Sequence, residues 1–375
     1  MKNISILGST GTIGRLTLDV IQKLTGKFKI SGLAANRNVQ ILSEQIEMCS
    51  PAEAVVFDEE QCSSLKASKS TRLGCGAEEL VSLATRPDLD ILVVAMTGTA
   101  AVDAVLEALR LGKRVALASK EILVSYGEHV KKALLEGKGE LLPIDSEHSA
   151  LHQCLDGQDS RAIKRIILTA SGGPFRDKDY KRATPEDVLN HPTWNMGKRI
   201  TVDSATLMNK GFEVIEASWL FDLLPEKIEV VIHPQSIVHS MVEFIDGSLL
   251  AQLSMPDMRL PIEYALLYPE RGPRLIEGLD LASIGVLEFS KPDFERFPAL
   301  SIAYEALIKG GTSPCVLEAA DHEAVEQFLS RKLDFEQIPR IINDALKNHN
   351  HVQDPSLEQI RDAQRFAREF VIKGV

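Results

Sequence analysis

The sequence predicts an α/β protein with an N-terminal doubly wound, Rossmann-type domain, a central α+β domain with an open sheet, and a C-terminal helical bundle. Three observations support this prediction. Short β-branched runs alternate with helical patterns over roughly the first 140 residues, which is typical of βαβ units. Closely spaced strands follow, and a run of helical patterns fills the C-terminal part. A length of 375 residues suits two or three domains.

The first region is expected to form a parallel sheet with helices on its faces. Helical patterns over Thr12–Leu24 and Thr99–Leu111 separate apolar runs of strand length. The strands expected are Asn3–Leu7, Lys29–Ala34, Ala54–Phe57, Ile91–Ala95, Arg114–Ala118 and Glu140–Leu142.

The pattern changes after Pro143. Strands are expected at 163–170, Ile228–His233, Ile237–Phe244 and Leu249–Leu253, and Asp246-Gly247 is a hairpin turn signal. This indicates an open, largely antiparallel sheet, with helices near 147–156 and 203–221. Further helices are expected at 298–309, 315–330, 335–348 and 355–373. The regions expected are therefore 1–143, 144–268, a linker at 269–296, and 297–375.

Composition excludes several classes of partner. The net charge of −11 argues against nucleic acid, which needs a surplus of Lys and Arg. The longest apolar runs, such as Ile91–Met96, are far shorter than a membrane span, and Ile4–Leu7 is too short for an export signal. Five scattered cysteines without a Cys-x-x-Cys pair favour free thiols in a reducing compartment. A cytoplasmic protein is expected.

A glycine-rich loop follows the first expected strand and opens the first expected helix. Glycines 8, 11 and 14 have the spacing G-x-x-G-x-x-G, a variant of the dinucleotide-binding fingerprint. They allow a tight turn, and the helix N-terminus then faces a pyrophosphate. The strand–turn–helix context makes this a strong signal.

The end of the second expected strand indicates which dinucleotide binds. An NAD site has Asp or Glu there to hold the ribose 2′-hydroxyl. This chain has Ala35-Asn-Arg-Asn38, with no carboxylate and with Arg37 available for a 2′-phosphate. The pattern favours NADPH, although Arg37 taken alone could be a solvated loop residue.

Two acidic segments are candidates for a metal site. In an extended chain the carboxylates of Asp145 and Glu147 point the same way, and a hard divalent cation would relieve their repulsion. A helix cap is the alternative for this pair, and spacing alone favours the cap. Further along, Asn209 and Glu213 share a helix face with Lys210 nearby, which suits a phosphate beside a metal. An ordinary charged helix surface remains the alternative there.

Two loops are candidates for substrate binding. Ser171-Gly-Gly presents backbone N–H groups and a hydroxyl, as anion-binding nests do. Trp194 and Met196 lie in a loop punctuated by Pro and Gly, where they would suit a lid that excludes water. Core packing of the aromatic ring is the alternative.

Taken together, the motifs resemble those of the 1-deoxy-D-xylulose 5-phosphate reductoisomerase family. They occur in the family's order from residue 3 to about 310, and the tail is less similar. The segments that carry the resemblance are Gly8-Ser-Thr-Gly-Thr-Ile-Gly14, Asp145-Ser-Glu-His148, Ser171-Gly-Gly-Pro-Phe175, His191-Pro-Thr-Trp-Asn-Met-Gly197, Asp203-Ser-Ala-Thr-Leu-Met-Asn-Lys-Gly211, His233-Pro-Gln-Ser236 and Pro256-Asp-Met-Arg259.

The resemblance implies a metal-dependent, NADPH-dependent rearrangement and reduction of a small phosphorylated sugar by a homodimer. It implies Mg²⁺ or Mn²⁺ on Asp145, Glu147 and Glu213. Catalytic roles are implied for Lys120, Glu147, His191 and His239. Substrate-binding roles are implied for Ser146, Ser171, His191, Trp194, Met196, Ser204, Asn209 and Lys210. Cofactor-binding roles are implied for Gly8, Ser9, Thr10, Gly11, Thr12, Ile13, Gly14, Ala35, Asn36, Arg37, Asn38, Ser119, Lys120, Glu121 and Gly197.

Ser119 and Ala319-Ala-Asp-His-Glu323 depart from the family pattern, and two other functions are alternatives. Ser119 stands where the family commonly has Asn, which shortens a polar side chain expected near the nicotinamide. A semialdehyde-type NADP-dependent dehydrogenase would need a nucleophilic cysteine, and Cys154 lacks a suitable setting. A dinucleotide-sensing scaffold would not need the three carboxylates that this chain has.

Overall fold

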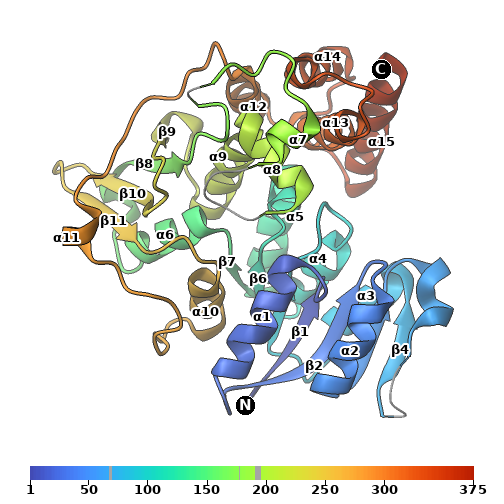
Figure 1. Cartoon of the computed structure of the whole chain (residues 1–375). Helices are drawn as coiled ribbons and strands as arrows, with labels where there is room; N and C mark the ends of the chain where they lie inside the picture. The colour runs from blue at the N-terminus through green and yellow to red at the C-terminus, as the bar shows by residue number, and fades with distance from the viewer. Residues whose placement is uncertain (67–69, 177, 191–195) are drawn as a thin grey trace. The chain divides into compact units, whose positions relative to one another are not determined.

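The computed structural model describes residues 1–66, 70–176, 178–190 and 196–375, which form two compact units. The first unit comprises Met1–Ile122, Glu128–Ser149 and Asp257–Glu277, and the second comprises Leu123–Gly127, Ala150–Pro256 and Gly278–Val375. The elements of each unit are labelled in Figure 1.

The first unit contains a seven-stranded parallel sheet with the order β4-β3-β2-β1-β5-β6-β7. The strand order reverses beside β1, which pairs with both β2 and β5, so the expected doubly wound class is confirmed. β4, at the edge, was not expected. The strands are β1 (Lys2–Leu7), β2 (Phe28–Ala35), β3 (Glu53–Val56), β4 (Arg72–Cys75), β5 (Ile91–Val94), β6 (Arg114–Leu117) and β7 (Glu140–Pro143).

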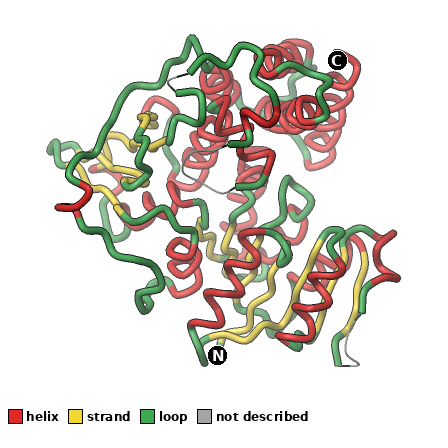
Figure 2. Tube along the Cα trace, viewed as in Figure 1, coloured by secondary structure: helices red, strands yellow, loops and turns green. Residues whose placement is uncertain are grey.

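Helices connect these strands (Figure 2), and the sheet residues are buried beneath them. The core includes Ile4, Ile6, Leu33 and Val93, none of which is exposed. Residues 257–277 return late in the chain, and their helix packs against α1. The helices are α1 (Thr12–Lys23), α2 (Val39–Cys49), η1 (Glu59–Ser64), α3 (Gly76–Ala84), α4 (Val102–Arg110), α5 (Lys120–Gly137) and α10 (Arg259–Leu267).

The second unit contains a four-stranded sheet with the order β11-β10-β8-β9. β10 is antiparallel to both β8 and β11, as the sequence predicts. β8 and β9 are parallel because helices, not a hairpin, connect them. The strands are β8 (Ile163–Ala170), β9 (Ile228–Ile232), β10 (Val238–Phe244) and β11 (Leu249–Leu253).

The helices of the second unit include the four expected in the tail, which gather near the C-terminus in Figure 1. α13 is the central one, because it contacts α12, α14 and α15 and has twelve buried residues. The helices are α6 (Ser146–Leu155, entering from the first unit), η2 (Ser160–Ala162), α7 (Pro185–Val188), α8 (Lys198–Thr206), α9 (Met208–Phe221), η3 (Pro225–Lys227), α11 (Leu281–Ile284), α12 (Pro298–Lys309), α13 (Ser313–Leu329), η4 (Phe335–Gln337), α14 (Ile338–Asn348) and α15 (Leu357–Gly374).

The structure corrects the expectation that all five cysteines are free thiols. Cys62 in η1 and Cys75 at the end of β4 form a disulfide, with their Cα atoms 6.1 Å apart. The pairing depends on β4, which the sequence analysis did not predict. Cys49, Cys154 and Cys315 are free. Within the described part of the chain, no helix is both long and apolar enough to cross a membrane.

Candidate active site

The glycine loop joins β1 to α1 beside the reversal in strand order. At Gly8 the backbone has φ +86°, and a Cβ there would lie 2.4 Å from the carbonyl oxygen of Ala95. At Gly14 a Cβ would lie 2.2 Å from the carbonyl oxygen of Gly8. A Cβ at Gly11 would meet nothing closer than 3.4 Å. The loop itself therefore requires Gly8 and Gly14, whereas Gly11 leaves space for a ligand to approach the backbone.

Ser9 has a structural role in this loop. Its buried hydroxyl donates to Gln45 Oε1 at 2.7 Å, and its carbonyl accepts from Gln45 Nε2 at 2.9 Å. These bonds anchor the loop to α2. Thr12 and Ile13 form the first turn of α1, and Gly11 is its N-cap without a side-chain capping bond. The helix N-terminus thus offers its backbone N–H groups to an anion.

The loop after β2 carries the expected basic residue. Asn36, Arg37 and Asn38 are exposed, and Asn38 caps α2 by accepting from the N–H of Ile41. The Nε of Arg37 lies 2.5 Å from Oδ2 of Asp58. Asp58 follows β3 and was not identified from the sequence.

Lys120 and Asp145 form a mostly buried ion pair in the first unit. Lys120 begins α5, the helix that follows β6, and Asp145 follows the adjacent strand β7. Because β6 and β7 are parallel, both residues lie at the carboxyl ends of the strands. Lys120 Nζ is 2.5 Å from Asp145 Oδ2. The neighbouring Ser119 donates its hydroxyl to the carbonyl of Met96. The hydroxyl of Ser119 is therefore bonded within the protein. Glu121, the next predicted cofactor residue, is half-buried.

Asp145 directly precedes α6, and Ser146 and Glu147 are its first two residues. The hydroxyl of Ser146 donates to Glu147 Oε2, and the carbonyl of Asp145 accepts from the N–H of Ser149. The backbone is therefore a helix start, as the capping alternative proposed. The Asp145 carboxylate nevertheless contacts Lys120, which follows the neighbouring strand β6. A purely local helix cap would not require this contact.

The first turns of α9 carry the expected polar face in the second unit. Asn209 Nδ2 donates to Glu213 Oε1 at 2.6 Å, and Lys210 Nζ pairs with Glu213 Oε2. Lys210 is 3% exposed and Glu213 is 1% exposed, so this is not a solvated helix surface. Amide, ammonium and carboxylate therefore meet at one buried location.

The Ser171-Gly-Gly loop packs against the last turn of α8. Gly172 and Gly173 have φ of +85° and +66°, and the N–H of Gly173 lies 3.4 Å from Ser171 Oγ. A Cβ at Gly173 would lie 2.7 Å from the carbonyl oxygen of Ser204. The glycine therefore allows the segments that carry Ser171 and Ser204 to come together.

The covering loop is only partly described. His191 and Trp194 lie outside the described residues. Met196 is half-buried, and Gly197 is the N-cap of α8, where its carbonyl accepts from Thr201 Oγ1 at 2.8 Å.

Three family models match the chain. They are 1-deoxy-D-xylulose 5-phosphate reductoisomerase at residues 4–127, the C-terminal domain of that enzyme at residues 141–221, and the DXP reductoisomerase C-terminal domain at residues 253–370. The chain belongs to the 1-deoxy-D-xylulose 5-phosphate reductoisomerase family. Two curated relatives carry that name. The Pelotomaculum thermopropionicum protein is 50% identical over 382 residues, covering 100% of this chain and 99% of its own. The Caldanaerobacter subterraneus protein is 50% identical over 381 residues with the same coverage.

Solved structures of reductoisomerases have the same fold. The Zymomonas mobilis enzyme in complex with NADPH has a TM-score of 0.93 and 40% identity, covering 99% of this chain and 98% of its own. A reductoisomerase in complex with NADPH, fosmidomycin and magnesium has a TM-score of 0.91 and 36% identity, covering 100% and 98%.

Two histidines of this reductoisomerase-family chain have different roles in its second sheet. His239 on β10 is buried, with Nε2 2.8 Å from Ser254 Oγ. His233 Nε2 accepts from the N–H groups of Ile237 and Val238, so its proton is on Nδ1 and faces the carbonyl of Glu288 at 2.8 Å. The His233 side chain therefore fixes the backbone at the start of β10 and links it to the carbonyl of Glu288.

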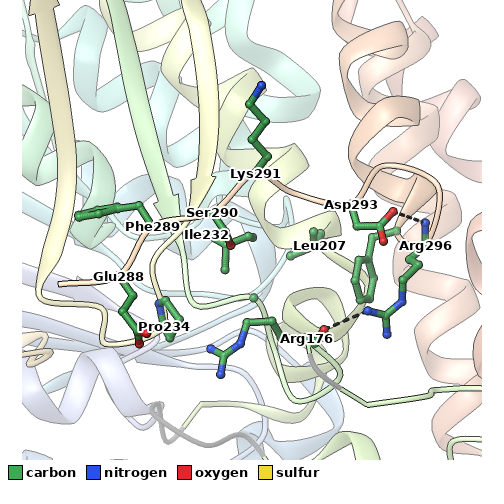
Figure 3. Close-up of a pocket in the computed structure, with 12 residues that line it drawn as sticks. Arg176, Leu207, Ile232, Pro234, Glu288, Phe289, Ser290, Lys291, Asp293 and Arg296 are labelled. Atoms are coloured by element: carbon green, nitrogen blue, oxygen red, sulfur yellow. Dashed lines mark hydrogen bonds between the residues drawn. The ribbon is translucent and has the colours of Figure 1, made fainter. Parts of the chain in front are cut away.

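A cavity of about 450 Å³ is lined in part by Gly172 of the Ser171-Gly-Gly loop, and Figure 3 shows the side chains around it. Gly172, Leu207 and Ile232 form one part of its wall. Arg296 lines another part and donates to the carbonyls of Phe175, Arg176 and Lys178. Arg296 thus holds the loop that carries Ser171, a role that its isolated position in the sequence did not indicate.

Proposed function

We propose that this chain catalyses the NADPH-dependent conversion of 1-deoxy-D-xylulose 5-phosphate to 2-C-methyl-D-erythritol 4-phosphate, a step of non-mevalonate isoprenoid precursor biosynthesis. The observation that carries this is membership of the reductoisomerase family over the whole chain at 50% identity. The local chemistry of both units fits it. A divalent cation, Mg²⁺ or Mn²⁺, is the second cofactor.

The first unit has the features that NADPH binding needs. Gly8 and Gly14 shape the loop, Gly11 leaves its surface open, and Arg37 supplies positive charge where NAD sites have an acid. We assign cofactor binding to residues 8–14, 35–38, 119–121 and to Gly197. Ser9 would act by anchoring the loop, and Ser119 through its backbone, because both hydroxyls are bonded within the protein.

The carboxylates Asp145, Glu147 and Glu213 are the proposed metal ligands. Oxygen ligands of this kind suit a hard divalent cation, and two of the three are mostly buried beside a lysine in the structure. When bound, the cation would act as a Lewis acid that polarises the substrate's carbonyl and hydroxyl oxygens. Ser146 would contact the substrate's hydroxyl groups beside these carboxylates.

Ser171, Ser204, Asn209 and Lys210 are the proposed phosphate ligands. Lys210 supplies a buried positive charge, and the Ser171-Gly-Gly turn supplies N–H groups and a hydroxyl. Binding energy at this remote group orients the reacting end of the substrate. His191, Trp194 and Met196 would cover the bound substrate and exclude water.

The proposed reaction has two stages. A retro-aldol/aldol sequence cleaves and rejoins a carbon–carbon bond, and hydride transfer then reduces the aldehyde that forms. Glu147, Lys120, His191 and His239 are the proposed catalytic residues. Lys120 can hold a proton at Nζ close to Asp145, and His239 is oriented by Ser254.

The deciding experiment measures NADPH oxidation with 1-deoxy-D-xylulose 5-phosphate, with and without Mg²⁺ or Mn²⁺. Substrate-dependent oxidation that stops on chelation is expected. NADPH oxidation at an unchanged rate in the presence of the chelator would favour a simple dehydrogenase. NADPH binding without turnover would favour a sensor. The semialdehyde-type dehydrogenase is disfavoured because burial raises the pKa of the Cys154 thiol to about 11.

We also propose a cytoplasmic homodimer. NADPH and sugar phosphates are cytoplasmic metabolites, which supports the location. The outer edge of β11 supports the assembly, because Leu249 and Leu250 are 50% and 42% exposed there.

A further inference from the structure

The guanidinium of Arg37 is held from one side by a carboxylate of the neighbouring strand. Asp58 Oδ2 lies 2.5 Å from Arg37 Nε. The Asp58 side chain is 13% exposed, whereas the Arg37 side chain is 77% exposed. The pair therefore has an anchored member and a member that faces solvent.

Asp58 is itself fixed in three ways. Its N–H donates to the carbonyl of Asn36 at 3.2 Å, and the preceding Phe57 donates to the carbonyl of Ala35 at 2.9 Å. Its Oδ1 accepts from the N–H of Glu60 at 3.0 Å and so caps η1. One carboxylate oxygen thus holds the turn, and the other holds Arg37.

This geometry leaves the outer edge of the guanidinium available. A guanidinium has five N–H donors in a fixed fork, and the Asp58 contact is made at Nε. The terminal nitrogens, Nη1 and Nη2, can then donate together to two oxygens of one phosphate.

We propose that Asp58 is a positioning residue for recognition of the 2′-phosphate, which it serves by holding Arg37 so that Nη1 and Nη2 face that phosphate. The inference rests on the proposed use of NADPH. Asp58 has two opposing effects on the phosphate. Its charge repels the phosphate weakly, because that charge is already paired with the Arg37 guanidinium. Its contact removes much of the entropy cost of ordering a long arginine side chain on the phosphate. Ordering is the larger effect, so Asp58 favours binding.

The informative substitution is Asp58→Asn. Asparagine is as good an N-cap as aspartate, so η1 keeps its cap through Oδ1. The amide nitrogen that replaces Oδ2 is a donor and cannot accept from Arg37 Nε, so the bond to Arg37 is lost. Glu60→Gln is the matched control, because it removes the same charge from the same turn at an exposed residue.

Binding to the full-length protein is measured by calorimetry and NADPH fluorescence, with NADPH, NADH, 2′,5′-ADP and 5′-AMP as ligands. Asp58→Asn should raise the Kd of NADPH and 2′,5′-ADP by roughly three- to tenfold. It should leave the Kd of NADH and 5′-AMP unchanged, and raise KM for NADPH without lowering kcat. Glu60→Gln should change none of these constants.

Three results would overturn the inference. They are an equal loss of NADPH and NADH binding, an unchanged Kd for NADPH, or an effect of Asp58→Asn that persists when Arg37 is already Ala. The Arg37→Ala variant distinguishes the role proposed for Arg37 from the role proposed for Asp58. If it binds NADPH normally, the role proposed for Arg37 is wrong. If it weakens NADPH binding and Asp58→Asn does not, only the role of Asp58 is wrong.

Discussion

At the scale of single residues, two of the three proposed metal carboxylates are paired with lysines. Asp145 contacts Lys120 in the first unit, and Glu213 contacts Lys210 in the second. Each pair is mostly buried, so neither charge is solvated well by water. Removing one member therefore leaves a buried charge as well as a missing ligand, and mutant activity must be interpreted together with mutant stability.

Glu213→Gln is expected to abolish most activity through loss of metal affinity. It should also lower the free energy of unfolding by on the order of 1–3 kcal/mol, because Lys210 loses its counter-charge. Calorimetric Mn²⁺ titration, turnover and thermal unfolding check these effects. Adding Lys210→Met should restore stability but not metal binding. Unchanged turnover with tight Mn²⁺ binding in Glu213→Gln would exclude Glu213 as a ligand.

Contacts within one helix could be predicted from the sequence, whereas contacts between distant segments could not. Local spacing placed Asn209 and Glu213 on one helix face, because residues four apart share a face. The partners of Arg37 and Asp145 follow other strands of the sheet, and no local pattern indicates such pairings. Ser119 shows the same limit, because its bond to Met96 depends on how two strand ends meet.

At the scale of elements, the glycine loop permits a paired test. Gly14→Ala should destabilise the first unit, because the new Cβ would overlap the carbonyl of Gly8. Gly11→Ala should keep the wild-type melting temperature and still weaken NADPH binding, because its Cβ fits the protein but occupies the side left open. Thermal unfolding and NADPH fluorescence separate the two variants. Normal NADPH affinity in Gly11→Ala would show that the cofactor does not approach this position.

A buried charge cluster joins α8 to α13. Arg199 on α8 lies 2.9 Å from Glu318, 3.5 Å from Asp321 and 3.8 Å from Asp203. It also donates to His322 Nδ1 at 2.8 Å, so that ring carries its proton on Nε2. The single guanidinium of Arg199 is therefore close to three carboxylates. Arg199 lies on α8, the helix that also carries Ser204.

The cluster predicts a pH dependence of stability. Burial, and then the nearby Glu318, raise the pKa of Asp321 to about 7, although Arg199 opposes the shift. Between about pH 4 and pH 7 the folded protein therefore holds a proton that the unfolded chain has released. The free energy of unfolding should fall as pH rises through this window.

Asp321→Asn should remove that pH dependence. We expect a gain on the order of 1 kcal/mol at pH 8 and a smaller gain, or none, at pH 5. Thermal unfolding of both proteins from pH 5 to pH 8 measures the difference. Glu305→Gln on α12 is the matched control, because it removes the same charge at an exposed residue. Parallel stability curves for the wild type and Asp321→Asn would show that Asp321 does not titrate in this window.

The elements that the sequence predicted are those with strong apolar runs. The six expected strands of the first sheet lie within one residue of their observed ends, because each run is buried and flanked by turns. β4 was missed because Arg72-Leu-Gly-Cys75 is short, contains glycine and lies at an edge. The parallel pairing of β8 with β9, and the return of α10 to the first unit, depend on tertiary contacts that a local pattern does not contain.

At the scale of the whole molecule, one hairpin and its flanks carry several exposed apolar side chains. Ile245, Leu249, Leu250 and Met255 lie in or beside the β10–β11 hairpin and are 37% to 71% exposed. β11 ends its sheet, so its outer backbone groups can also pair with another chain. An exposed apolar edge of this kind is expected at an interface between copies of the chain.

Leu250→Lys is therefore expected to weaken the proposed homodimer. Leu250 is already 42% exposed in the single chain, so a charge there should change the stability of the monomer by no more than about 0.5 kcal/mol. In a dimer, the same lysine would be desolvated without a partner, at a cost of several kcal/mol. Size-exclusion chromatography with light scattering should give a dimer for the wild type and a shift towards monomer for Leu250→Lys. Leu135→Lys is the control, because that residue is 75% exposed on α5 and should leave the mass unchanged. A dimer that withstands Leu250→Lys would place the interface on another surface.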